Sequence, residues 1–163
     1  FHARHSSVGK RYRYLVCNLP YRSPFSRNKS WWVRKSLNLE VIRDASSYLV
    51  GKHDFSAFRA AACSSPNPNK DLREILCDVK PWLHANLCFE LEADSFLQHM
   101  VRIMVGTLVQ VGTGKLKPEQ MKGILESRDR TQAGLTAPAH GLYALAVRYP
   151  EDSIEWPDEL MDS

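Results

Sequence analysis

The first periodic segment of the chain, residues 10–18, alternates between two kinds of side chain. Tyr12 and Tyr14 fall on one face of an extended chain, while Arg11 and Arg13 fall on the other. Successive side chains of a strand point to opposite faces, so this period of two predicts a β-strand.

The same period recurs in residues 73–79 and 87–93, with a proline-containing break at residues 81–84 between them. Two alternating runs joined by such a break predict an antiparallel hairpin. A last strand is predicted just before residue 150, with Leu145 and Val147 on its core face.

Apolar residues spaced three and four apart predict three helices, over residues 39–50, 96–112 and 118–127. Gly51 ends the first helix, and Pro118 suits the first turn of the third. The middle helix has the strongest pattern, because its apolar side chains form one broad stripe. The stripe consists of Leu97, Met100, Val101, Met104, Val105, Leu108 and Val111.

Few strands, several helices and no strand–helix–strand alternation indicate an α+β fold with a largely antiparallel sheet and helices packed on one side. The 163 residues suffice for one domain, which we expect to span residues 1–150. An acidic and flexible tail is expected over residues 151–163, and a polar, exposed loop over residues 64–70.

The composition, with 44% hydrophobic and 25% charged residues, excludes a disordered tract, collagen and a coiled coil. Arg102, Gln110 and Lys115 interrupt the longest apolar stretch, so we expect neither a transmembrane helix nor a membrane partner. Because the sequence opens at Phe1 rather than Met and shows no leader, we expect it to be part of a longer chain.

Positive charge is concentrated at the start of the chain. Residues 1–35 contain nine basic side chains and no acidic one, whereas residues 150–163 contain six acids and no base. Without that tail, 22 basic residues face 12 acidic ones, which leaves a net charge of +10. A solvated basic face is the plain interpretation, but interleaved aromatic rings favour a nucleic-acid partner. These rings are Tyr12, Tyr14, Tyr21, Phe25, Trp31 and Trp32.

The four cysteines form no CxxC pair and no zinc spacing with the histidines. We therefore expect no metal site, and reduced thiols in an intracellular reducing compartment, either the cytoplasm or an organelle matrix; a disulfide is the alternative. No phosphate-binding loop or dinucleotide fingerprint is present, and no cofactor is expected.

The predicted helix over residues 96–112 has a polar back side. Ser95, His99, Arg102 and Gly106 fall together opposite the apolar stripe. A mid-helix glycine costs about 1 kcal/mol relative to alanine, so Gly106 indicates close approach of a backbone or a ligand. His99 and Arg102 can reach one phosphate or carboxylate, but spacing alone does not distinguish this from a structural salt bridge in the core.

Two further positions have alternative interpretations. Tyr12, flanked by Lys10, Arg11 and Arg13, is either a stacking platform for a base or an ordinary packing residue. Leu142 is either an apolar residue at a strand end or the wall of a pocket.

Five segments, taken in order and at their natural spacing, resemble the C-terminal half of the TruA family of tRNA pseudouridine synthases. The segments are FHAR (1–4), KRYRY (10–14), GKHDFSAFRA (51–60), DSFLQHMVRIMVGTLVQVGTGKL (94–116) and RDRTQAGLTAPAHGLYALAVRYP (128–150).

The resemblance implies a homodimeric isomerase that converts uridine to pseudouridine in the anticodon stem-loop of tRNA, without metal or organic cofactor. By matching positions, Tyr12 stacks on the target uracil, Arg102 orients the catalytic Asp, and Leu142 forms the apolar wall of the uracil pocket. The side chains expected to contact RNA are Lys10, Arg11, Arg13, Arg59, Lys70 and His99.

The sequence departs from the family pattern in three places. The family's catalytic Asp lies in a Gly-Arg-Thr-Asp motif before FHAR, and no such motif occurs here, so we expect this chain alone to be inactive. Lys70 replaces an arginine, which keeps the charge but loses two-pronged contact with phosphate. Ala144 replaces a bulkier apolar residue. A non-catalytic RNA-binding module or a dimerisation domain is the alternative function.

Overall fold

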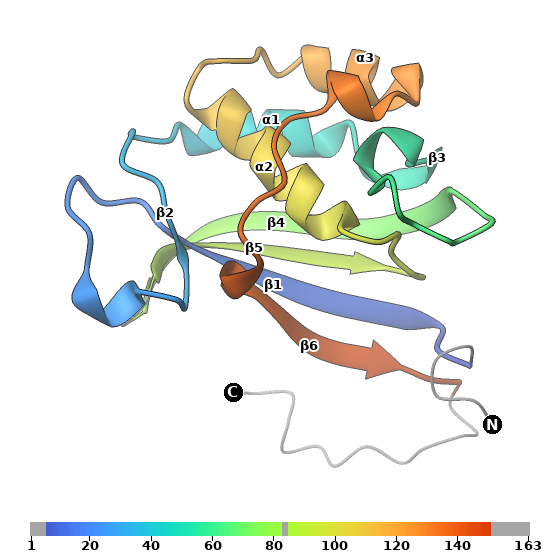
Figure 1. Ribbon diagram of the computed structural model, residues 1–163, viewed down its shortest axis with the longest axis horizontal. Helices are drawn as coiled ribbons and strands as arrows, with labels where there is room; N and C mark the ends of the chain where they lie inside the picture. The colour runs from blue at the N-terminus through green and yellow to red at the C-terminus, as the bar shows by residue number, and fades with distance from the viewer. Residues whose placement is uncertain (1–5, 83–84, 151–163) are drawn as a thin grey trace.

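The structure, a computed structural model, describes residues 6–150 except 83 and 84 (Figure 1). The FHAR segment, the expected acidic tail over residues 151–163 and the tip of the break at residues 81–84 therefore lie outside the described residues.

The centre of the fold is a six-stranded sheet with the order β2-β1-β5-β4-β3, in which β6 also pairs with β1. Every pairing is antiparallel except that of β1 with β2. The α+β fold with a largely antiparallel sheet is thus confirmed. The strands are β1 (Gly9–Cys17), β2 (Trp31–Trp32), β3 (Gly51–Asp54), β4 (Asn69–Trp82), β5 (Ala85–Ala93) and β6 (Leu142–Arg148).

The three α-helices lie together on one side of this sheet (Figure 1). They are α1 (Leu39–Ser47), α2 (Met100–Gly112) and α3 (Gln120–Ser127). Asn38 caps α1, because its side-chain oxygen accepts hydrogen bonds from the backbone N–H groups of Glu40 and Val41. The predicted helices are confirmed in number and place, and none in the described residues is long and apolar enough to cross a membrane.

Each of the three helices has one boundary that differs from the prediction, and α3 begins at Gln120 rather than at residue 118. The second helix begins at Met100 rather than at residue 96, because His99 adopts a left-handed conformation with φ of 60°. The first helix ends at Ser47, and Gly51, with φ of 116°, opens β3 instead of only stopping the helix. At four residues, β3 is too short to show an alternating pattern.

Helix α2 is covered on almost every side, because all its residues except Arg102 and Gln110 are buried. The apolar stripe packs into the core, and the back side meets the chain at residues 135–137. A Cβ atom at Gly106 would overlap the carbonyl oxygen of Leu135. The close backbone approach expected from this glycine is therefore present.

The prediction that Leu145 lies on the core face of the last strand is wrong. Its side chain is 40% exposed, because β6 contains a bulge. Arg11 pairs with Ala146 and Tyr12 with Ala144, which leaves Leu145 as the extra residue. A bulge shifts the alternation by one residue, so parity counted from the sequence fails beyond it.

The face of the sheet opposite the helices carries a network of arginine and glutamate side chains. Arg11 and Arg13 both donate hydrogen bonds to the Glu90 carboxylate, at 2.8 Å and 2.8–3.0 Å. Arg11 also contacts Glu92, and both carboxylates are only 8% exposed. Burial disfavours the charged form of Glu90, but the hydrogen bonds from Arg13 and Arg11 outweigh it and lower the pKa of Glu90.

Gly106→Ala is expected to lower the free energy of unfolding by about 1–3 kcal/mol, because the added methyl group forces α2 away from residues 135–137. Gly123→Ala is the matched control, since a Cβ there meets nothing within 4 Å; it should stabilise the protein by about 0.4–1 kcal/mol. Urea denaturation of both variants measures the difference, and equal stabilisation by both substitutions would contradict the packing at Gly106.

Glu90→Gln is expected to lower the free energy of unfolding at pH 7 by about 1.5–3 kcal/mol, the range for hydrogen bonds to charged groups. Because folding lowers the pKa of Glu90, its contribution is complete above the unfolded value of about 4.3 and disappears as the pH falls through the folded value. Urea denaturation from pH 7 to pH 3 should therefore show the wild-type and variant stabilities converging. Glu126→Gln, at an exposed pair with Lys122, should change little at any pH.

Candidate functional site

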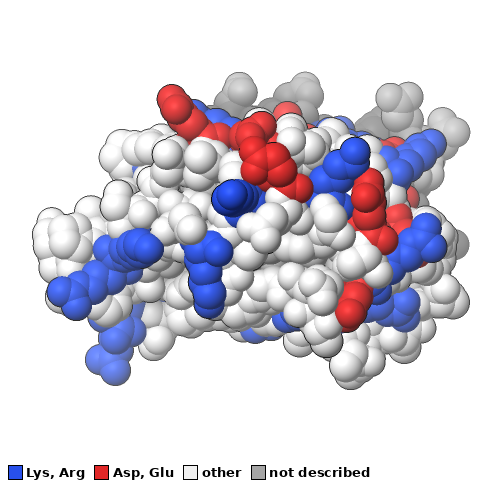
Figure 2. Space-filling model, turned by 90° about the horizontal axis from the view of Figure 1, so that it is seen from above, with Lys and Arg blue, Asp and Glu red and all other residues white. Residues whose placement is uncertain are grey.

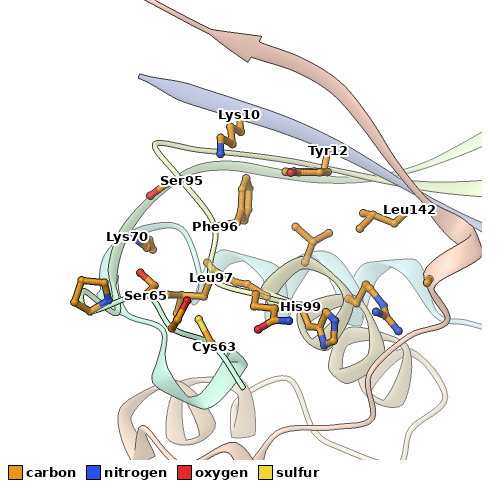
Figure 3. A pocket seen from close by; sticks show the side chains of 17 residues that line it. Lys10, Tyr12, Cys63, Ser65, Lys70, Ser95, Phe96, Leu97, His99 and Leu142 are labelled. Atoms are coloured by element: carbon orange, nitrogen blue, oxygen red, sulfur yellow. The ribbon is translucent and has the colours of Figure 1, made fainter. Parts of the chain in front are cut away.

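An open cavity of about 1030 Å³ lies between the helix-covered face of the sheet and the start of α2 (Figure 3). Five separate parts of the chain line it: β1, the loop at residues 63–66, the start of β4 at Lys70, residues 95–102, and residues 139–142 at the start of β6. Of the nine side chains predicted as functional, the cavity brings together six. These are Lys10, Tyr12, Lys70, His99, Arg102 and Leu142.

Tyr12 lies on the face of β1 that Tyr14 and Val16 also occupy, but nearer the start of the strand, where it is only half-buried. Its ring meets that of Phe96 edge to face, with 5.3 Å between the ring centroids and 88° between the ring planes. This contact fixes the orientation of a flat aromatic surface that faces the cavity (Figure 3). The packing and stacking interpretations of Tyr12 are therefore compatible.

Arg102 is held by the backbone of a segment far away in the sequence. Its Nε donates to the carbonyl oxygen of Ala137 at 2.7 Å, and the N–H of Ala137 donates back to the carbonyl oxygen of Arg102 at 3.0 Å. Among the residues that the structure describes, no carboxylate forms an ion pair with Arg102. The salt bridge to a core carboxylate, which the spacing left open, is thus not found in that part of the chain.

Leu142 reaches the cavity because residues 134–141 are fixed at several points. The Tyr14 hydroxyl donates to the carbonyl oxygen of Pro138 at 2.6 Å, and burial raises the pKa of this phenol. Gly141 packs against the Tyr14 ring, where a Cβ would approach to 2.6 Å. Leu142 then opens β6 opposite Tyr14, half-buried and on the cavity side. Of its two interpretations, the structure favours the pocket wall.

Lys10 and Lys70 line the cavity, and Figure 3 shows them on the side where Ser95 lies, away from Leu142. His99 lines the side formed by the start of α2, and its left-handed backbone turns the chain into that helix. These basic side chains border a pocket that is also lined by the aromatic and apolar side chains of Tyr12, Phe96 and Leu142. Such an arrangement suits an anionic ligand with a flat ring, which is the chemistry of a nucleotide.

Three predicted RNA-contacting residues lie elsewhere. Arg11 and Arg13 occupy the opposite face of the sheet, in contact with Glu90. Arg59 supports the loop beside the cavity, because its Nη2 donates to the carbonyl oxygens of Cys63 at 3.0 Å and Ser65 at 2.6 Å. The structure therefore gives these arginines structural contacts and does not bring them into the cavity.

Phe96 and Cys63 are among the lining residues that the prediction from the sequence omitted. Phe96 belongs to the DSFLQHMVR stretch, so the resemblance contained a signal for it. Cys63 has no such signal. Burial opposes ionisation of its thiol, but hydrogen bonds from the Gln98 and Ser65 backbone and the charge of Arg59 lower the pKa of Cys63. Among the described residues, no group of histidine, cysteine or acidic side chains could hold a metal ion.

Residues 45–150 match the model of a family described as tRNA pseudouridine synthase. A protein of Syntrophotalea carbinolica named tRNA pseudouridine synthase A is 43% identical over 157 residues, which cover 95% of this chain and 61% of the relative. Proteins with the same name from a Thermoanaerobacter species and from Orientia tsutsugamushi are each 42% identical over 149 residues. They are covered to 60% and 52% of their lengths, and each match covers 91% of this chain.

The chain thus spans about 60% of the length of two of these relatives and about half of the third. The region matched by the family model includes the end of α1, the sheet from β3 onward and most of the cavity lining, and the longer matches to the relatives extend over nearly the whole chain. With the motifs noted in the sequence, these similarities show that the chain belongs to the tRNA pseudouridine synthase family.

Proposed function

We propose that the protein containing this chain isomerises uridine to pseudouridine in tRNA, and that this chain supplies the uracil pocket. The observation that carries the proposal is the grouping of Tyr12, Arg102 and Leu142 in one cavity, with the guanidinium oriented by Ala137. The anticodon stem-loop is the proposed target within tRNA, and a homodimer is the proposed assembly.

The reaction breaks the bond between N1 of uracil and C1′ of ribose, rotates the base, and joins C5 to C1′. C5 then loses its proton while N1 gains one, so atoms and charge balance without a co-reactant. Between the two bond changes the detached ring must stay in place. Tyr12 offers a stacking surface for it, and Leu142 offers an apolar wall beside it.

The role proposed for Arg102 follows from the different contacts of its three side-chain nitrogen atoms. Its Nε is used on the Ala137 carbonyl, which leaves the two Nη groups for an anion in the cavity. We propose that this anion is the catalytic carboxylate and that it comes from the part of the protein outside this chain. The coverage of about 60% of two relatives supports this assignment.

Arg102→Ala in the full-length protein should lower the single-turnover rate of pseudouridine formation by about 100-fold or more. Removing one partner of a buried ion pair leaves the other charge uncompensated, and about 3 kcal/mol corresponds to that factor. Affinity for tRNA should change less than about threefold. The measurements are the single-turnover rate with unmodified tRNA and a binding titration.

Arg102→Lys is the matched variant for this experiment. The ammonium group of lysine lacks the planar fork that puts Nε on the Ala137 carbonyl and both Nη groups on a carboxylate, so it should restore only a small part of the rate. If Arg102→Ala instead weakened tRNA binding and left the single-turnover rate intact, Arg102 would be a phosphate ligand. That result would contradict its proposed role.

Tyr12→Ala should weaken binding of tRNA by about fivefold or more, because loss of base stacking costs about 1–3 kcal/mol. Tyr12→Phe keeps the ring and its edge-to-face contact with Phe96, and should retain most of the affinity. A filter-binding titration of both variants tests the prediction. Equal affinities for the two variants would show that the ring only packs against Phe96.

A further inference from the structure

Several exposed basic side chains without a carboxylate partner are grouped in residues 20–35, the basic loop that connects β1 with α1 and includes β2. The loop contains no acidic residue. Among the described residues, no carboxylate forms an ion pair with the exposed side chains of Arg22, Arg27, Arg34 or Lys35. Arg11 and Arg13, in contrast, both form ion pairs with Glu90, and Arg11 also pairs with Glu74 and Glu92. Because these loop side chains have no carboxylate partner, they should attract a polyanion more strongly than the paired Arg11 and Arg13 of β1.

The basic loop also exposes two aromatic rings. Tyr21 and Phe25 are 67% and 66% exposed, the highest values among the large hydrophobic side chains of the described residues. Trp31 and Trp32 differ, because both are half-buried and support the loop. The Trp32 indole N–H donates to the carbonyl oxygen of Leu19 at 3.0 Å. Packing accounts for the tryptophans and leaves Tyr21 and Phe25 without an internal role.

The loop is an ordered support for these rings. The Asn18 side chain donates to the carbonyl oxygens of Val33 and Lys35, both at 2.8 Å, and so closes the base of the loop. Ser26 and Ser30 are buried inside it, and the N–H of Ser30 donates to the carbonyl oxygen of Ser26 at 3.2 Å. A surface fixed in this way loses little conformational entropy when it binds a ligand.

The basic loop is joined directly to the wall of the cavity. The Tyr143 hydroxyl donates to the carbonyl oxygen of Lys29 at 2.8 Å, and His140 Nε2 lies 3.1 Å from the carbonyl oxygen of Ser30. Both residues flank Leu142, which lines the cavity. A strand that leaves the cavity past Leu142 thus meets the loop next.

Figure 2 shows basic side chains without acidic ones at the end of the molecule where Figure 1 places this loop. We propose that the basic loop binds the backbone of the RNA strand that continues from the cavity, and stacks an unpaired base on Tyr21 or Phe25. This inference rests on the proposed function. Cations without acids beside exposed rings match single-stranded RNA better than a protein surface.

The test uses the full-length protein and an unmodified tRNA transcript, with the affinity measured over a range of salt concentrations. For the double variant Arg22→Ala and Arg27→Ala, the slope of log affinity against log salt should become shallower by about 1.4, since each lost contact to a single strand contributes about 0.7. Lys52→Ala with Lys122→Ala is the control, because it removes the same charge from exposed positions on β3 and α3. Its slope should stay unchanged.

Phe25→Leu keeps an apolar side chain but removes the ring, and should weaken binding about fivefold or more. The single-turnover rate at saturating tRNA should be unaffected, because the loop lies outside the cavity lining. If the Arg22→Ala and Arg27→Ala double variant kept the wild-type salt slope and Phe25→Leu kept the wild-type affinity for tRNA, the inference would be overturned. A changed oligomeric state in analytical ultracentrifugation would also overturn it, because the loop would then be a protein interface. Absence of pseudouridine formation by the wild-type protein would instead refute the proposed function, whatever the loop variants show.

Discussion

The site depends on one contact, the docking of residues 134–138 against helix α2. Gly106 allows the backbone to approach, and Arg102 and Ala137 exchange two hydrogen bonds across the contact. Thr107 adds a third, because its hydroxyl accepts from the N–H of Gly134 at 2.9 Å. Orientation of the guanidinium and placement of Leu142 both follow from this docking, since the same segment leads directly into β6. A larger side chain on this face of α2 would therefore disturb the cation and the pocket wall together.

The alternation of β1 divides its side chains between two different tasks. Even-numbered residues from Lys10 to Tyr14 face the cavity or the core, whereas Arg11 and Arg13 face the carboxylate of Glu90. Opposite charges pair with one another on the sheet face away from the helices, and no helix of the described residues covers that face (Figure 1). An arginine in a basic stretch thus acquires its role from the strand face on which it lies. This explains why the cluster of cations in the sequence overestimates the number of cations that β1 contributes to the cavity.

Long periodic elements could be predicted from the sequence because many residues repeat the same signal. The strand at Tyr12, the hairpin of β4 and β5, and the apolar stripe of α2 all belong to this class. Features that depend on one residue or a few residues were missed. These are the left-handed turn at His99, the bulge at Leu145, and the short strands β2 and β3. For the site, spacing gave only alternatives, because the partner of Arg102 lies 35 residues further along the chain. Tyr12, Arg102 and Leu142 were identified as site residues by the resemblance to a family, and the fold brings the three side chains into one cavity.

An isomerase that detaches a base and joins it again through another atom consumes nothing, so its protein must supply position rather than reagents. The cavity has the properties that this task requires. The ring of Tyr12 is fixed by Phe96, and the cation is fixed by a backbone carbonyl instead of a mobile side chain. A backbone partner cannot titrate or swing away, so Arg102 keeps its direction whether or not a carboxylate is present. In the proposed mechanism the incoming carboxylate therefore meets a cation that is already oriented, and little reorganisation is needed at the moment of reaction.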